Sequence, residues 1–266
     1  MFKFFQKKRE QRLVAEAKAR TFKQVLTDLE NGNGNPLEAA LVLHLTADDQ
    51  DSLARFLITL GRSELWLLKK TDERFGDPAV TEGPDGNPFV AAFSSLERAR
   101  SAAATWQLAN RSSAISALEL VFVLSPSVGF VLNADDPHLQ WTFTPEQVSN
   151  LRSVFEQSYN YELGGIYSIW GEGAFRAAKL LAADDGGVHL RVYANTFSER
   201  PTNVDPASLT LDSSNSESVR AIGHMPLVRA GFLAMGPKLL ATTPVTEDEL
   251  EGYKMWKDAE GGYFGA

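Results

Sequence analysis

The residues of this sequence that could do chemistry are, first, its four histidines. His44, His138, His189 and His224 stand far apart in the sequence, and the chain contains no cysteine. A catalytic zinc site needs about three protein ligands, often grouped as in H-E-x-x-H, and that motif is absent here. We therefore expect no metal site, no thiolate nucleophile and no disulfide.

Three pairs of adjacent aspartates could supply carboxylates for acid–base chemistry: Asp48 and Asp49, Asp135 and Asp136, and Asp184 and Asp185. Each pair is better explained as a helix cap or a turn, because an aspartate accepts hydrogen bonds from nearby backbone amides. The chain also lacks the G-x-S-x-G, Walker and G-x-G-x-x-G motifs. These observations predict a non-enzymatic protein that needs no cofactor.

A strand predicted over residues 188–195 carries the most informative polar pattern. Apolar residues alternate with hydrogen-bonding residues, which places four polar side chains on one face: His189, Arg191, Tyr193 and Asn195. This face could bind an anion or a peptide carboxylate through Arg191, with Tyr193 as a flat contact. The alternative is the ordinary solvent-facing side of an antiparallel sheet.

The amino-terminal head is basic and aromatic, whereas the remainder of the chain is acidic. The first 30 residues carry eight Lys or Arg and four Asp or Glu, within a chain whose formal net charge is -8. An acidic body argues against nucleic-acid binding. The head has the composition of a weak membrane contact or a partner-docking segment, through the following residues: Phe2, Phe4, Phe5, Lys7, Lys8 and Arg9.

The elements that position these residues begin with helices. Helical spacing places one apolar face of a first helix on these positions: Ala15, Ala19, Phe22, Leu26 and Leu29. We expect Gly32 to end this helix and Asn35 to cap a second one that begins at Pro36. A third helix is predicted after the capping candidates Asp48 and Asp49, ending at Gly61.

Residues 63–157 are predicted to mix strands and helices. Strands are expected at 65–68, 89–93, 129–132 and 141–143, with a turn-rich insert that ends at 84–87. Ser94 and Glu97 have the spacing of a capping box, so a helix should begin near Leu96 and end near Thr105. The segment 115–124 fits either a helix or a buried strand, and a helix is favoured. Thr144 and Pro145 open one more helix.

The second half is predicted to be rich in antiparallel strands. Strands are expected at 166–170, 175–181 and 188–194, and the last two flank the hairpin turn 184–187. A final helix is expected over about 247–260, with Thr246 and Glu249 as its capping box. A curled sheet that ends in a helix, open or barrel-like, follows from this order.

Five segments, in this order, resemble the SseB-type amino-terminal domain of bacteria: 35–41, 63–68, 85–96, 128–133 and 144–147. The resemblance covers residues of about 35–157 and implies an α+β fold. It implies no agreed activity, and it offers no catalytic residues to carry over. One departure is the loop after Asn133, where the family usually has Asn-Pro-Gly and this chain has the longer, more acidic Ala134-Asp135-Asp136-Pro137.

We therefore expect an α+β protein of three parts: a basic helix and linker (1–34), an SseB-like domain (35–157) and a β-rich domain with a carboxy-terminal helix (158–266). The sequence shows neither a secretory signal nor an apolar run long enough to span a bilayer, which favours the cytoplasm. The expected role is that of a protein-interaction or scaffold module with a protein partner. The alternatives are an immunity-type protein that neutralises a toxin and a protein attached to the membrane surface by its head.

Overall fold

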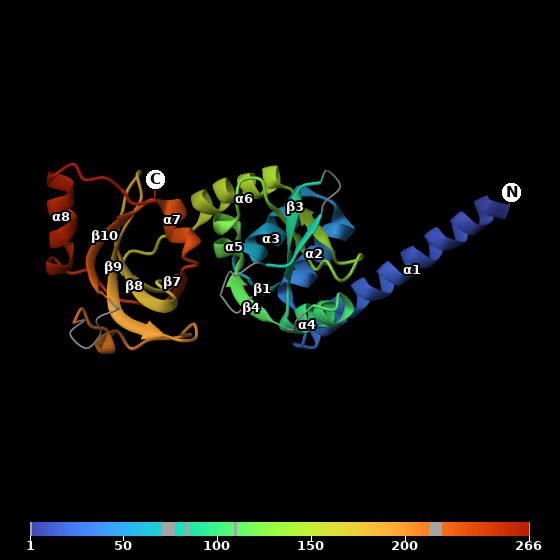
Figure 1. Ribbon diagram of the computed structural model, residues 1–266, viewed down its shortest axis with the longest axis horizontal. Coiled ribbons are helices and arrows are strands. Elements are labelled where there is room, and N and C mark those ends of the chain that lie inside the picture. Colours follow the sequence, from blue (N-terminus) through green and yellow to red (C-terminus); the bar gives the residue numbers. More distant parts are fainter. Residues whose placement is uncertain (1, 71–77, 83–85, 109–110, 213–219, 266) are drawn as a thin grey trace. The chain divides into compact units, whose positions relative to one another are not determined.

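The structure is a computed structural model that describes residues 2–70, 78–82, 86–108, 111–212 and 220–265, with side chains from residue 11 onward. Helices and strands are mixed throughout, which confirms the α+β class (Figure 1). The chain divides into two compact units. The first comprises Met1–Ala117 and Ser125–Ser149, and the second comprises Leu118–Leu124 and Asn150–Ala266.

The described helices of the first 158 residues begin and end largely as predicted: α1 (Phe2–Glu30), α2 (Pro36–Ala47), α3 (Gln50–Gly61), α4 (Leu96–Thr105), α5 (Ala117–Val123) and α6 (Pro145–Ser158). Asn35 caps α2 by accepting a hydrogen bond from the amide of Leu37 at 2.9 Å. Gly32, with φ of 76°, follows the end of α1 in the left-handed conformation that glycine tolerates.

Two of these starts correct the sequence analysis. The cap of α4 is Ser95 and not Ser94, because Oγ of Ser95 accepts from the amide of Arg98 at 3.2 Å. Within 115–124, the favoured helix is confirmed as α5, but Ile115 belongs to a strand.

The sheet of the first unit contains six strands: β1 (Glu64–Leu68), β2 (Val80–Glu82), β3 (Pro88–Phe93), β4 (Ser112–Ser116), β5 (Gly129–Leu132) and β6 (Trp141–Phe143). Their order is β4-β1-β3-β5-β6, with β2 beside β3, and only β3 and β5 run parallel among these pairs. The helix α4 packs its alanines Ala99 and Ala102 against Phe93 on one face. Part of the predicted turn at 84–87, residues 84 and 85, lies outside the described residues.

The second unit is built on an antiparallel sheet with the order β10-β9-β8-β7-β11. Its described elements after α6 are β7 (Gly165–Gly171), β8 (Ala174–Ala183), β9 (Val188–Phe197), η1 (Pro206–Ser208), β10 (Ile222–Leu227), α7 (Arg229–Ala234), β11 (Lys238–Thr242), η2 (Asp248–Leu250) and α8 (Glu251–Asp258). The predicted hairpin between β8 and β9 is confirmed, because Oδ1 of Asp184 accepts from the amides of Gly186 and Gly187. The sheet is open, since no pairing joins β10 to β11 among the described strands.

The helix α5 contributes to the second unit although it precedes most of that unit in the sequence. Glu119 is fully buried and lies 3.4 Å from a guanidinium nitrogen of Arg200. Arg152 donates to the carbonyl of Val121 at 2.8 Å, which satisfies one of the carbonyls at the end of α5. Buried ionic groups are thus paired within this unit.

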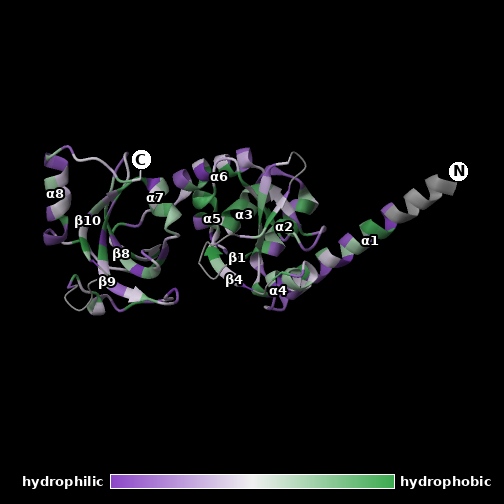
Figure 2. Cartoon of the chain, viewed as in Figure 1, coloured by the Kyte–Doolittle hydropathy of each residue, from purple (hydrophilic) through white to green (hydrophobic). Residues whose placement is uncertain are grey.

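The hydropathy of the residues follows the arrangement of the sheets and helices (Figure 2). The central strands of both sheets are hydrophobic, whereas α8 is mostly hydrophilic. Among the described helices, none is long and apolar enough to cross a bilayer.

Candidate functional site

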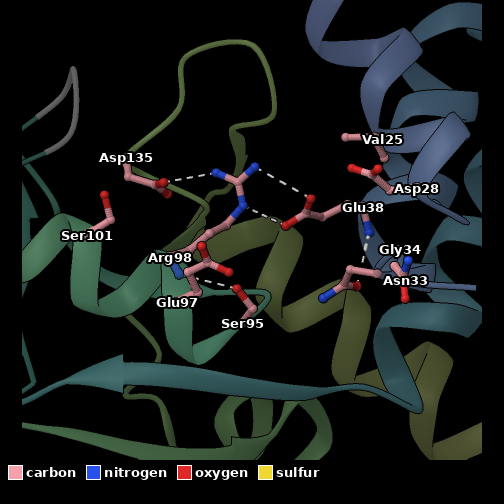
Figure 3. Close-up of a pocket in the computed structure, with 11 residues that line it drawn as sticks. Val25, Asp28, Asn33, Gly34, Glu38, Ser95, Glu97, Arg98, Ser101 and Asp135 are labelled. Atoms are coloured by element: carbon pink, nitrogen blue, oxygen red, sulfur yellow. Dashed lines mark hydrogen bonds and ion pairs between the residues drawn. The ribbon is translucent and has the colours of Figure 1, made fainter.

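A pocket of about 430 Å³ in the first unit gathers residues from two of the segments that carry the SseB resemblance, 35–41 and 85–96, and from residues near them (Figure 3). The start of α2 supplies Asn35 and Glu38, the start of α4 supplies Ser95 and Arg98, and the loop after β5 supplies Asp135. The end of α1 and the linker that follows it complete the wall, with side chains that include Val25, Asp28 and Asn33.

Arg98 lies at the centre of this pocket and is held by carboxylates on two sides (Figure 3). Its Nε lies 2.6 Å from Oε1 of Glu38, and its Nη1 lies 2.9 Å from Oδ2 of Asp135. A third carboxylate, that of Asp136, lies 3.7 Å from Nη2. Three carboxylates therefore surround one guanidinium, and the cluster has an excess of negative charge when all four groups are ionised.

Burial and charge act against each other in this cluster. Burial by itself would lower the pKa of Arg98, but the hydrogen bonds and charges of Glu38 and Asp135 raise it, so the guanidinium stays charged. Burial raises the pKa of Asp135, and the nearby Arg98 only partly offsets this effect. The second oxygen of Asp135, Oδ1, is buried and has no hydrogen-bond partner among the described residues. The site therefore has an acceptor that its own side chains leave unsatisfied.

The backbone of Ser94 forms the frame behind the pocket. Its amide donates to Oδ1 of Asn133 at 2.9 Å, its carbonyl accepts from Nδ2 of Asn35 at 2.8 Å, and its hydroxyl donates to Glu38. These bonds explain why Ser94 does not cap α4. Asn133 adopts a positive φ of 52°, a conformation that asparagine accepts more readily than most residues.

The rim of the pocket adds two more carboxylates, Asp28 from α1 and Glu97 from α4. With Glu38 and Asp135, four carboxylates face one guanidinium among the lining residues. This arrangement can attract and hold a cationic group, because charge-assisted hydrogen bonds to partly buried carboxylates are strong.

The structure places the four residues of the predicted polar face in different surroundings. His189 is fully buried, so it is not on an open face as the strand pattern had suggested. Arg191 lies 3.4 Å from Oε1 of Glu249, which comes from η2. Tyr193 is partly buried, and Asn195 binds the backbone of Ser208 and Thr210. The segment of η2 and α8 covers the first part of this face, and a binding role for the four residues stays a prediction.

Two histidines that the sequence separates meet beneath α8. Nδ1 of His189 lies 3.0 Å from Nε2 of His224, and Nε2 of His189 lies 3.1 Å from Oδ2 of Asp184. The rings of Tyr253 and Trp256 pack on His189 with centroids 4.5 and 4.6 Å away. Sequence reasoning missed this cluster because its residues come from a turn, two strands and a helix.

This histidine pair has the geometry of a shared hydrogen bond. The two ring nitrogens face each other, so one donates a proton to the other and they do not converge on an ion. Burial lowers the pKa of both His189 and His224, and the charge of His189 lowers that of His224 further. Among the described residues, no group of three or more His, Asp or Glu side chains is placed to hold a metal ion.

The side chains of the predicted amino-terminal contact lie outside those that the structure describes: Phe2, Phe4, Phe5, Lys7, Lys8 and Arg9. Their backbone is helical and belongs to α1. A membrane or partner contact at this head stays a prediction.

Comparison with known proteins gives a family match for part of the chain. Residues 37–150 match the family described as SseB protein N-terminal domain. No curated protein and no solved structure matches the chain. The match covers the Arg98 pocket apart from its α1 wall and linker, and it confirms the resemblance seen in the sequence. The family match of this chain is therefore to the SseB protein N-terminal domain, over residues 37–150.

Proposed function

We propose that this protein is a non-enzymatic protein-interaction module, and that the pocket around Arg98 receives a basic side chain of a protein partner. One observation carries the proposal: the pocket holds more carboxylate than its own cation can neutralise, and Oδ1 of Asp135 is buried without a partner among the described residues. A lysine or arginine side chain would supply the missing positive charge.

The geometry favours a cation over an anion. Arg98 already donates to Glu38 and Asp135, so its guanidinium is not available for a phosphate or a substrate carboxylate. A guest anion would also meet Asp28 and Glu97 at the rim, and like charges repel. A guest cation would instead place its aliphatic stem near Val25 and its charged end near Asp135.

The lining also favours binding over catalysis. The described side chains that line the pocket include no histidine, and Ser95 uses its hydroxyl to cap α4. A nucleophile would need a neighbouring base within hydrogen-bond reach. Binding therefore accounts for the lining better than a reaction does.

The first test is an NMR titration of the full chain with N-acetyl-arginine amide, and with N-acetyl-citrulline amide as its neutral analogue of the same shape. We expect the arginine compound to shift the amide signals of Glu97 and Asp135 with a Kd on the order of millimolar, because it makes only a few contacts. The citrulline compound should shift them much less. Equal shifts from both compounds, or none from either, would refute the proposal.

Variants of the rim give a matched control. The double variant Asp28→Asn, Glu97→Gln removes two rim charges without touching the bonds of Arg98, and it should weaken arginine binding about tenfold. The double variant Asp51→Asn, Glu146→Gln changes the net charge equally at residues away from the pocket and should leave binding unchanged. A photocrosslinker at Ser101, with Ala104 of the same helix as its control, then identifies the partner, and the cross-linked peptide should contain Lys or Arg.

A further inference from the structure

Two cations lie directly opposite each other on the sheet of the second unit. Lys179 of β8 is the register partner of Arg191 on β9, so their side chains share one face. Like charges in this position repel and destabilise a strand pair. The side chain of Lys179 is only 4% exposed, so water cannot screen the repulsion well. This pair of residues requires an anion.

The anion in the structure is a carboxylate of the same chain. Nζ of Lys179 lies 3.0 and 2.8 Å from the two carboxylate oxygens of Glu249, and Nη1 of Arg191 lies 3.4 Å from one of them. Glu249 does not satisfy the site completely, because Nε of Arg191 is buried and has no hydrogen-bond partner among the described residues. Two cations thus share one carboxylate, and the Nε donor of Arg191 has no acceptor among the described residues.

The segment that carries Glu249 is anchored at few points. We call residues 246–258, which contain η2 and α8, the C-terminal strap. Neither η2 nor α8 contains a buried residue. Besides Glu249, the strap is held by Tyr253 and Trp256, whose rings pack on His189 and His224, and Trp256 also contacts Tyr263. A further ion pair joins Lys254 to Glu247 within the strap itself.

We propose that Lys179 and Arg191 form a carboxylate-binding site for an acidic, aromatic helix of a protein partner, and that the C-terminal strap occupies this site as an intramolecular ligand. The strap defines the chemistry of the partner. Glu249, Tyr253 and Trp256 follow one another at spacings of four and three residues, which is one face of a helix. A partner helix with a carboxylate and two aromatic residues at this spacing would make the same contacts after the strap leaves.

This site is separate from the Arg98 pocket and belongs to the other unit. Its ligand has the opposite charge to the ligand proposed for that pocket. A failed test at either site therefore leaves the other proposal standing.

Gly252 gives a way to release the strap without changing the site. A Cβ atom at this position would lie 2.6 Å from Cβ of His224, closer than side chains approach, so Gly252→Ala must push α8 away from β10. Figure 1 shows α8 beside β10 in this unit. Lys179, Arg191 and Glu249 are unchanged in this variant.

The experiment uses the full chain and a fluorescent peptide with the sequence of residues 244–258. We expect the peptide to bind Gly252→Ala about tenfold more tightly than the unaltered chain, with hydrogen exchange reporting the release of residues 248–258. The peptide with Glu249→Gln should bind the Gly252→Ala chain about tenfold more weakly than the unaltered peptide does. The unaltered peptide should likewise bind about tenfold more weakly when the Gly252→Ala chain also carries Arg191→Gln.

Two outcomes would overturn the proposal. In the first, the strap exchanges rapidly in Gly252→Ala and the sheet stays folded, but the peptide does not bind, or the Glu249→Gln peptide binds equally well. In the second, neither Gly252→Ala nor the double variant Tyr253→Ala, Trp256→Ala increases exchange in the strap. That result would mean that the strap is a fixed part of the fold.

Discussion

The Arg98 pocket of the first unit and the Lys179–Arg191 site of the second unit have opposite charge balances. In the first cluster, three carboxylates lie within 4 Å of one guanidinium, and Glu38, Arg98 and Asp135 line a pocket. At the other site, two cations hold one carboxylate beneath a segment of the same chain. Both clusters leave one buried polar atom unpaired among the described residues, Oδ1 of Asp135 and Nε of Arg191.

The two clusters show that an excess of charge has different consequences when it is exposed to water and when it is buried. An excess that faces water is screened, and it remains available to a ligand from solution. An excess that is buried must be balanced by a group that the fold itself supplies. The first arrangement suits a site that can bind a ligand at any time. The second suits a site that binds a ligand only after the covering segment has moved away.

The largest expected effect is that of Lys179→Met, because it removes a cation from the covered site. Breaking a buried ion pair costs about 3–5 kcal/mol, and Glu249, which is 12% exposed, would keep only its long contact to Arg191 as an ion pair, beside the hydrogen bond from the amide of Thr246. The free energy of unfolding from urea titration measures this loss. The control is Lys254→Met, whose exposed pair with Glu247 should leave the unfolding midpoint unchanged. A loss for Lys179→Met no greater than for this control would contradict our account of the covered site.

A smaller loss is expected from Arg98→Met in the open pocket. Three carboxylates would lose their cation, but water in the pocket can solvate them, so we expect about 2 kcal/mol in the same titration. Arg98→Lys should recover part of this loss, since it restores the charge without the planar fork that reaches Glu38 and Asp135 together. If Arg98→Met costs more than Lys179→Met, the distinction between an open and a covered cluster fails.

The smallest expected effect is that of mild acid on the second unit. Burial lowers the pKa of His189 and His224 in the folded chain. Below about pH 6.5 the unfolded chain therefore binds more protons at these two histidines than the folded chain does. The stabilising contribution is therefore complete above this pH and decreases as the pH falls toward the lowered values. The nearby carboxylate of Asp184 raises the pKa of His189, but burial has the larger effect, so the pKa of His189 is lowered.

Urea unfolding at pH 7 and pH 5.5 checks the sign of this effect. The variant His224→Gln should reduce the difference between the two conditions, whereas His138→Gln, in a loop of the first unit, should not. A second unit that becomes more stable at pH 5.5 would show that the buried pair prefers the charged form.

Local signals in the sequence predicted much of the fold. The caps Asn35 and Asp49, the turn at Asp184 and the reciprocal hydrogen bonds between Thr246 and Glu249 all act within a few residues, so their patterns are visible in the sequence. The alternation in β9 also predicted that Arg191 would share a face with His189. These predictions depend on local backbone geometry alone.

The candidate sites depend on contacts that local patterns do not contain. In the sequence, Ser94 is the favoured cap because Glu97 follows it at capping-box spacing, but its amide is bound by Asn133, 39 residues away, and Ser95 is the cap. Lys179 lies in a mostly apolar strand that also contains Arg176, and the pattern of this strand does not reveal that Glu249, 70 residues later, provides its partner. The burial of His189 likewise depends on where the final helix docks, which is a property of tertiary packing.

The membership of α5 in the second unit has a consequence for how the chain is made. Residues 118–124 leave the ribosome well before Arg152 and Arg200, and the contact between Glu119 and Arg200 can form only after 81 more residues have been added. The second unit therefore cannot finish folding as an independent tail. A fragment that ends near residue 150 would keep α5 but lose the environment that buries it. Expression of the two halves as separate pieces should accordingly favour aggregation over two soluble products.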